Sequence, residues 1–302
     1  MLNTILQRSF APLLVLAGLV VPTQAAIVFN DTFEDIGGTS TKGDDAGDPN
    51  DLNWLSSLSP GTVAVVNDPF AGGGSLRALQ FSSTDSFRRF GANFTPSAIA
   101  NIGDQLNLSF ALRFTEAPTN NQLGFRFGLY NSVGTNIVTD NGSITQPTQQ
   151  NDDVGYYARV STGVTPPIFT NDILDEPAGD NPLGGGVGGT VVSTPSGSPV
   201  TIGDQTLHTM SLNLTRTSAT SVSMSLSIDG VVKATGTDSG SIFTTFDTIY
   251  FGQGNVSTDF QIDNVQLEAL AVPEPSSLAV AGLGVVGMLM LRRRGASLPM
   301  IR

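Results

Sequence analysis

Three stretches of this chain alternate apolar residues with polar or small ones, position by position. They are "QLNLSFALRF" at 105–114, "HTMSLNLTR" at 208–216 and "SVSMSLSIDG" at 221–230. Because successive side chains of a β-strand point to opposite faces, this period of two predicts strands with one buried and one solvated face. Residues 26–271 carry no sustained helical period, so we expect antiparallel sheets throughout.

Two local signals indicate how these strands turn and bend. Asp229-Gly230 separates two apolar runs by two residues that tolerate positive φ, which predicts a tight hairpin. In "DFQIDNVQLEAL" the apolar phase shifts by one residue at Asp263-Asn264. One extra residue in a strand restores the phase, so a β-bulge is expected there.

Many strands without helices in one long body favour an all-β fold. We predict a two-sheet antiparallel β-sandwich over residues 26–271. The chain has no cysteine, so the stability of this body must come from its apolar core and not from disulfides. A body of this length is large enough to bury such a core.

The charge of the body limits its partners. Of the charged residues, 25 acidic and 9 basic side chains lie within 26–271, which leaves 16 net negative charges. A surface of this charge repels phosphate backbones, so nucleic acid is not expected as a partner.

The first 25 residues are typical of a secretory signal peptide. Arg8 is followed by an apolar stretch at 11–21, and small residues stand at Thr23 and Ala25. This order predicts cleavage by signal peptidase after Ala25, with Ala26 as the alternative. The apolar stretch is too short to span a bilayer comfortably, which disfavours an anchoring helix.

The C-terminal tail has three parts in order. Pro273-Glu274-Pro275 interrupts any strand or helix. An uncharged run at 278–291 follows, and as a short transmembrane helix its 14 residues would span about 21 Å. The cluster Arg292, Arg293 and Arg294 then stays cytoplasmic by the positive-inside rule, which leaves the body outside.

This order of Pro-Glu-Pro, short apolar span and basic cluster resembles the PEP-CTERM sorting signal over 272–294. The resemblance implies that an exosortase processes the protein at the inner membrane. It also implies release to the cell surface or extracellular matrix of a bacterium that makes exopolysaccharide. The extension 295–302 departs from the family's pattern. A permanent tail anchor is the alternative.

The body also resembles a known fold. The succession "FRRFGANFTP", "GDQLNLSFALRF", "GFRFGLYNS", "GYYARV", "LHTMSLNLTRT", "SMSLSIDGVV" and "FQIDNVQLEAL" is similar to the concanavalin A-like lectin/glucanase jelly roll, in its laminin-G-like variety. The resemblance implies that the first strand, "AIVFNDTFED", lies beside the last one. Two long polar loops are expected at 37–53 and 165–190.

No catalytic constellation is recognisable. The body has four glutamates, and none forms the alternating carboxylate motif that the glucanases of this fold use. His208 shares its parity with the apolar residues of its strand, which predicts a structural histidine on the core side. We therefore expect no enzyme. Tyr156, Tyr157 and Arg159 keep a lyase open as the alternative, and a concave sheet face carrying Arg and Tyr would favour it.

Calcium is the expected cofactor if any is bound, because acidic loops supply its oxygen ligands. One candidate loop holds four carboxylates: Asp44, Asp45, Asp48 and Asp51. A second holds Asp152 and Asp153 beside Asn151, and a third holds Asp172, Asp175, Glu176 and Asp180. Solvated acidic loops without metal are the more common outcome.

Glycan contact needs exposed aromatic platforms with polar rims. Trp54 after the acidic loop, and Tyr156 and Tyr157, are the candidates. We therefore predict an exported cell-surface or matrix protein that binds extracellular polysaccharide, with calcium as an optional aid. Two alternatives stay open: a lyase-like, polysaccharide-degrading enzyme and a purely structural matrix component.

Overall fold

A computed structural model gives the fold of the body. One compact unit runs from Gln24 to Val272. The residues that the structure describes are 25–33, 52–56, 61–67, 77–83, 88–118, 124–135, 152–162, 171–179, 182–183, 189–196, 200, 202–253 and 258–272. The predicted signal peptide up to residue 24 and the tail from 273, including the short helix at 278–291, lie outside these ranges.

Two antiparallel sheets contain all the strands. The nine-stranded sheet has the order β11 (Ser193–Pro195), β14 (Val231–Asp238), β13 (Ser221–Ile228), β12 (His208–Ser218), β6 (Gln105–Phe114), β16 (Phe260–Leu270), β4 (Arg77–Ser83) and β3 (Gly61–Asn67), with β1 (Ala26–Asp31) also paired to β16. The seven-stranded sheet has the order β10 (Thr190–Val191), β9 (Asp172–Glu176), β8 (Val154–Val160), β7 (Phe125–Asn131), β15 (Thr245–Gln253), β5 (Arg88–Ala98) and β2 (Leu55–Ser56).

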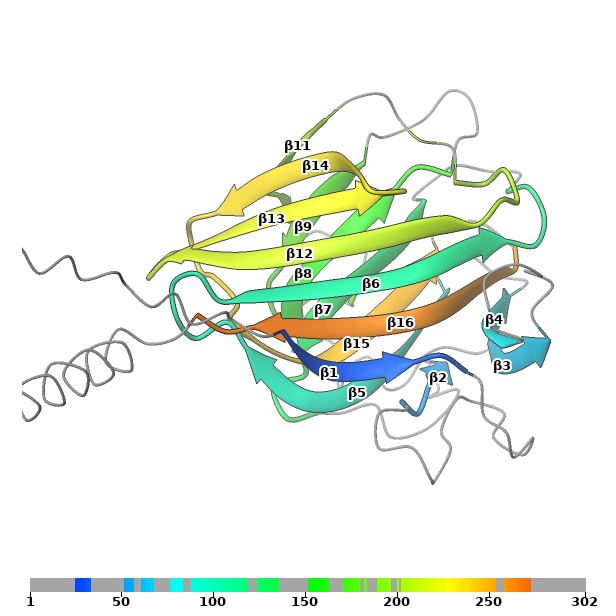
Figure 1. The fold of residues 1–302 in the computed structure, drawn as a ribbon, viewed down its shortest axis with the longest axis horizontal. Coiled ribbons are helices and arrows are strands. Elements are labelled where there is room, and N and C mark those ends of the chain that lie inside the picture. The colour runs from blue at the N-terminus through cyan, green and yellow to red at the C-terminus, as the bar shows by residue number, and fades with distance from the viewer. Residues whose placement is uncertain are drawn as a thin grey trace, which may run out of the picture. The chain divides into compact units, whose positions relative to one another are not determined.

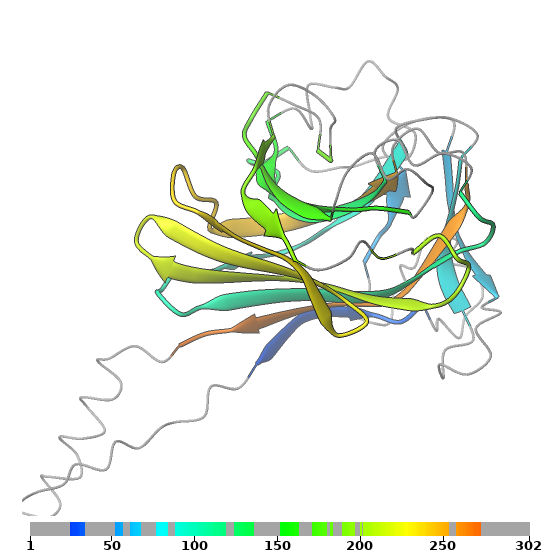
Figure 2. The same ribbon diagram turned by 90° about the horizontal axis from the view of Figure 1, so that it is seen from above.

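The two sheets stack as the layers of a sandwich (Figures 1 and 2). Phenylalanine side chains from both sheets fill the space between them. The Phe110 ring from β6 lies 4.7 Å from the Phe127 ring and 4.8 Å from the Phe251 ring, both edge-on. Such edge-to-face pairs add to the free energy gained by burying apolar area. The predicted all-β sandwich is confirmed, and the described residues contain no helix that could cross a membrane.

The predicted alternation is visible in burial. Along β6 and β13 every second residue is buried, and the residues between them are half-buried on the outer face. The inward set of β6 runs from Leu106 to Phe114 and belongs to the core. The period of two therefore assigns each side chain of these strands to its face.

The predicted hairpin and bulge are also present. Asp229 and Gly230 have φ values of 52° and 73° and join β13 to β14. The pairing of β16 with β6 shifts register between Asp263 and Gln266, and Asn264 has a φ of 51°. Left-handed conformations of this kind suit glycine and asparagine, so the local sequence matches the local geometry.

The first strand lies beside the last one. β1 pairs antiparallel with β16, with Ala26 opposite Ala269 and Asp31 opposite Val265, as Figure 1 shows. The expectation drawn from the jelly-roll resemblance is therefore confirmed. This pairing also brings the start of the described chain next to the outer face of the nine-stranded sheet.

Candidate functional site

The outer face of the seven-stranded sheet, turned away from the core, carries tyrosines seated over glycines. Tyr157 on β8 pairs across the strands with Gly128 on β7, which pairs in turn with Tyr250 on β15. A Cβ added at Gly128 would lie 2.6 Å from the Cβ of Tyr157, and one at Gly91 would lie 2.6 Å from the Tyr250 ring. The glycines are therefore required for the tyrosines to pack here.

Three arginines form the next row on this face. Arg159 donates to Asp172 with an Nε–Oδ1 distance of 2.9 Å. Arg126 donates to the Leu183 carbonyl, and Arg89 donates to the Pro182 carbonyl at 2.9 Å. Desolvation by burial lowers the pKa of both Arg89 and Arg126. Burying charges is costly unless they are bonded, so these carbonyls are part of what keeps the arginines inside.

Leu183 closes this face. Its side chain clusters with the three tyrosines Tyr130, Tyr157 and Tyr250. Its amide donates to Glu176 at 3.0 Å, and the Tyr130 hydroxyl donates to the same carboxylate. We call the tyrosines, the three arginines, Glu176 and Pro182–Leu183 the sealed layer.

Burial governs the chemistry of the sealed layer. Glu176 is 1% exposed and Tyr130 is fully buried, and desolvation raises the pKa of Tyr130 well above its usual value. The Tyr250 hydroxyl donates to Asp153 at 2.7 Å, and desolvation raises the pKa of Asp153 to about 8. All four side chains are hydrogen-bonded within the protein and buried from solvent.

The predicted aromatic platforms are wrong, because all three residues are buried. Trp54 lies in the core against Phe90 and Phe251, and its indole nitrogen donates to Asp31 at 2.7 Å. Tyr156 points between the sheets and donates to Asp238, and Tyr157 belongs to the sealed layer. None of them offers a ring face to a glycan.

The acidic clusters within the described residues do not converge. Asp152 accepts from Thr135, whereas the neighbouring Asp153 turns inward to Tyr250. In the third cluster Asp172 pairs with Arg159, Glu176 accepts from Tyr130, and Asp175 accepts from the Thr190 amide.. Alternation along β9 puts Asp175 on the opposite face from Asp172 and Glu176, and the latter two are held by different partners.

No metal site is found among the described residues. Four carboxylates of the first predicted loop and one of the third lie outside those ranges: Asp44, Asp45, Asp48, Asp51 and Asp180.

His208 is buried, as predicted, near the start of β12. Its Nδ1 lies 2.8 Å from Asp229 and its Nε2 lies 3.0 Å from Asp204. Desolvation acts to lower the pKa of His208, but the hydrogen bonds to the two aspartates outweigh it and the pKa is raised. The imidazole thus ties the 204–207 segment to the β13–β14 hairpin.

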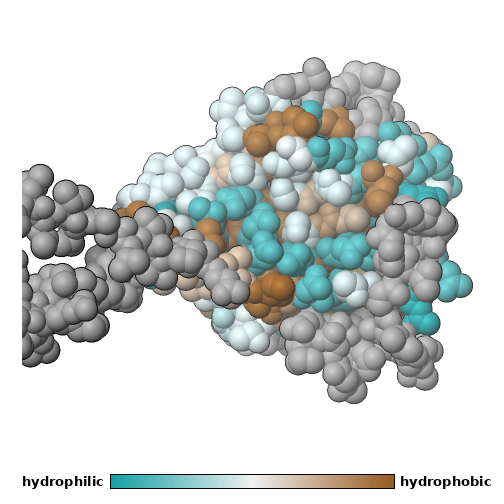
Figure 3. All heavy atoms as spheres, in the orientation of Figure 1, coloured by the Kyte–Doolittle hydropathy of each residue, from teal (hydrophilic) through white to brown (hydrophobic). Residues whose placement is uncertain are grey.

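The outer face of the nine-stranded sheet is polar and open. Figure 3 shows hydrophilic side chains gathered over the middle of β12, β6 and β16. Asn213 on β12 pairs with Asn107 on β6, which pairs with Glu268 on β16. Cross-strand partners lie about 5 Å apart, so these side chains form one continuous row.

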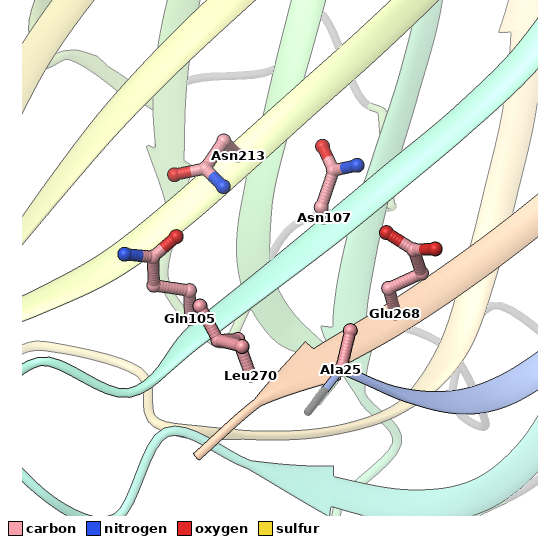
Figure 4. Close-up of a pocket in the computed structure, with 6 residues that line it drawn as sticks. All are labelled: Ala25, Gln105, Asn107, Asn213, Glu268 and Leu270. Atoms are coloured by element: carbon pink, nitrogen blue, oxygen red, sulfur yellow. The ribbon is translucent and has the colours of Figure 1, made fainter. Parts of the chain in front are cut away.

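A shallow depression of about 360 Å³ lies on this row. Figure 4 shows its lining residues, whose amide and carboxylate groups stand on the same face of the sheet: Ala25, Gln105, Asn107, Asn213, Glu268 and Leu270. Asn213 accepts from Thr215 at 2.9 Å, and Glu268 accepts from Gln266 at 3.0 Å. Within the described residues Asn107 and Gln105 make no side-chain hydrogen bond, so they can donate to and accept from a ligand.

Sequence reasoning missed this row. The alternating pattern predicts these residues only as the polar partners of buried ones. Two asparagines and one glutamate at outward positions of three strands were the available signal, but the sequence does not give the register that aligns them.

The fold and the tail together define a class: a β-sandwich body followed by a sorting tail. Residues 271–294 match the PEP-CTERM protein-sorting motif. This match confirms the resemblance of the tail and covers the predicted processing residues Pro273, Glu274, Pro275, Arg292, Arg293 and Arg294. The motif implies exosortase-dependent export and membrane-anchored processing.

Several solved structures are similar in fold. A protein of unknown function with a galectin-like fold from Bacillus subtilis matches at 10% identity and a TM-score of 0.48, over 82% of this chain and 98% of that one. A carbohydrate esterase from the Shiga toxin-encoding bacteriophage phi24B matches at 15% identity and a TM-score of 0.48, over 82% of this chain and 100% of that one. The potassium-bound Emp46p carbohydrate recognition domain matches at 11% identity and a TM-score of 0.43, over 72% of this chain and 88% of that one. No curated protein matches the chain.

Proposed function

We propose that the chain is an exported surface or matrix protein whose sandwich binds a neutral glycan at the depression on the nine-stranded sheet. The observation that carries this proposal is the row of Asn213, Asn107 and Glu268. Sugar hydroxyls both donate and accept hydrogen bonds, and side-chain amides do the same at fixed angles. A carboxylate adds a stronger acceptor for a pair of hydroxyls.

The charge of the body favours a neutral ligand over an acidic one. The 16 net negative charges repel polyanionic chains. The depression is shallow and its lining has no aromatic ring, so binding of a single sugar unit is weak. A matrix polysaccharide offers many repeats, and many weak contacts along one chain raise the overall avidity.

Retention on immobilised neutral and acidic polysaccharides tests the proposal. The exported protein is compared with Asn107→Ala/Asn213→Ala, and Ser223→Ala on the same face serves as the matched control. We expect retention on a neutral glycan, lost by about 10-fold or more in the double variant and unchanged in the control. No retention on any glycan would overturn the proposal and favour a purely structural matrix role.

Calcium assistance is a finer part of this proposal. It is supported only by the acidic stretch with Asp44, Asp45, Asp48 and Asp51. Repeating the retention assay with calcium and with chelator tests it, because a site that depends on the ion loses its ligand when the ion is removed. Equal retention in both buffers would reject calcium.

A lyase-like enzyme is the second candidate, favoured by the arginines and tyrosines of the sealed layer. Arginines can neutralise a uronate carboxylate and a tyrosine can transfer a proton. Such chemistry requires Pro182–Leu183 to move away from the sheet. At present the Pro182 carbonyl accepts from Arg89 and the Leu183 amide donates to Glu176. An assay for unsaturated uronate products, run on the wild type and on Leu183→Gly, tests this. Absence of product in both would reject the enzyme.

A further inference from the structure

Ala25 occupies a special place beside the depression. It is exposed, directly precedes β1, and lines the depression together with Glu268 and Leu270 (Figure 4). It is also the residue after which signal peptidase cleavage is predicted. Ala25 therefore stands at the rim of the proposed glycan site.

The strand register shows which groups would be left after cleavage. Ala26 lies opposite Ala269 and Ile27 lies opposite Glu268. Neighbouring strands are about 4.8 Å apart. The nitrogen of Ala26 lies on the side of Ala25, and Ala25 and Glu268 line the same depression, so this nitrogen stands at the rim within which the Glu268 side chain lies. Gln266 donates to one oxygen of that carboxylate at 3.0 Å.

Resting on the glycan site proposed above, we infer that removal of the signal peptide completes that site, because it replaces Ala25 by the α-ammonium group of Ala26 beside Glu268. Water adds across the Ala25–Ala26 peptide bond. Ala25 departs with the new carboxylate, and the amine of Ala26 takes up a proton. The depression loses one wall residue and gains a cation with three donors next to its single carboxylate.

The ligand that fits the completed site is a neutral, hydroxyl-rich sugar. The ammonium and the Asn107 amide donate to hydroxyl oxygens, while Glu268 and Asn213 accept from hydroxyl hydrogens. In the unprocessed chain Ala25 fills the rim and an uncharged amide stands in place of the ammonium. Binding thus follows export, so the protein does not engage glycan before it is processed.

Two measurements on the exported protein test this inference. Mass spectrometry identifies its first residue, which we expect to be Ala26. The pH dependence of α-amine acetylation then gives the pKa of the amine. An ion pair with Glu268 raises this pKa above its ordinary range of about 7.7–8.0 by roughly half a unit to one unit. In Glu268→Gln the pKa returns to the ordinary range.

The controls separate this inference from the glycan site itself. Glu116→Gln, an exposed glutamate beyond the opposite end of β6, leaves the amine pKa unchanged. Selective acetylation is feasible because Lys42 and Lys233 are the only side-chain amines, and a lysine amine ordinarily titrates at about pH 10.4, well above an α-amine. We expect acetylation of Ala26 to lower glycan retention about 3- to 10-fold.

The outcomes are distinguishable. A raised pKa that depends on Glu268, without retention on any glycan, supports the ion pair and overturns the proposed function. Retention that is insensitive to acetylation, or an amine with an ordinary pKa, overturns this inference and leaves the glycan site standing. A mature N-terminus other than Ala26 also overturns it.

Discussion

Two glutamates lie on opposite outer faces of this sandwich, in different surroundings. Glu176, on the seven-stranded sheet, is 1% exposed and accepts from Tyr130 and from the Leu183 amide. Glu268, on the nine-stranded sheet, is half-buried and accepts from Gln266 at the edge of an open depression. A buried carboxylate must be fully bonded, whereas a solvated one keeps capacity for a ligand. Polarity alone therefore does not mark a binding face.

The largest expected effect separates these two glutamates. Glu176→Ala leaves the Tyr130 hydroxyl and the Leu183 amide buried without their acceptor, so we expect a loss of about 3–5 kcal/mol in the free energy of unfolding. Glu268→Ala on the open face should cost less than about 0.5 kcal/mol. Urea unfolding of both variants measures the difference. Similar losses in the two would contradict the distinction between a sealed and an open face.

The second prediction concerns the glycines against which the tyrosines of the sealed layer pack. Gly128→Ala places a methyl group 2.6 Å from the Tyr157 Cβ, so overpacking should cost about 2–3 kcal/mol. Gly230→Ala is the contrast, because its Cβ meets open space but its φ of 73° is left-handed. That variant should lose only about 1 kcal/mol. Thermal unfolding of both checks the order, and a Gly128→Ala protein of wild-type stability would show that the layer is loosely packed.

The third prediction concerns Asp153, which accepts a hydrogen bond from Tyr250 of the sealed layer. Burial raises its folded pKa to about 8, so the folded state holds a proton that the unfolded state releases near pH 4. The stability from this group is full below the unfolded pKa and is lost as pH rises through about 8. Asp153→Asn, which cannot ionise, should flatten the fall in stability between about pH 4 and pH 8, measured by urea unfolding. An unchanged pH profile in this variant would show that Asp153 is ionised in the folded protein.

The smallest effect is expected at His208. Its pKa is raised above 6.5 by the aspartates despite burial, so its contribution is full below the unfolded pKa and is lost as pH rises through the folded value. Because both aspartates are nearly half exposed, the loss should be at most about 1 kcal/mol. His208→Gln should remove this step, as unfolding at pH 5.5 and 8.5 would reveal. If the step persists in this variant, another group causes it.

Local patterns in the sequence predicted the elements of the fold. The alternation in 105–114 and 221–230 assigned side chains to the inner and outer faces, because the pleat of a strand has a period of two. Asp229-Gly230 and Asp263-Asn264 predicted a turn and a bulge because their backbone preferences are local. The tail was recognised from a short linear motif that needs no tertiary context.

The sites were not predictable in the same way. Trp54 lies in the core, and Tyr157 lies beneath Leu183. A sequence shows that a residue is aromatic but not what packs over it. Asn107, Asn213 and Glu268 come from strands about 50 to 160 residues apart in the chain, and only strand pairing aligns them.

The amino-acid sequence is enough to predict an exported protein that carries a sorting tail and folds into sheets with one apolar face. These properties depend on short-range periodicity and on linear signals. Only the folded structure shows which polar face is covered and which is open, and that Ala25 lies at the rim of the open one. The physical reason is that both outcomes depend on contacts between distant strands, whose register and covering segments are set by the packing of the whole core.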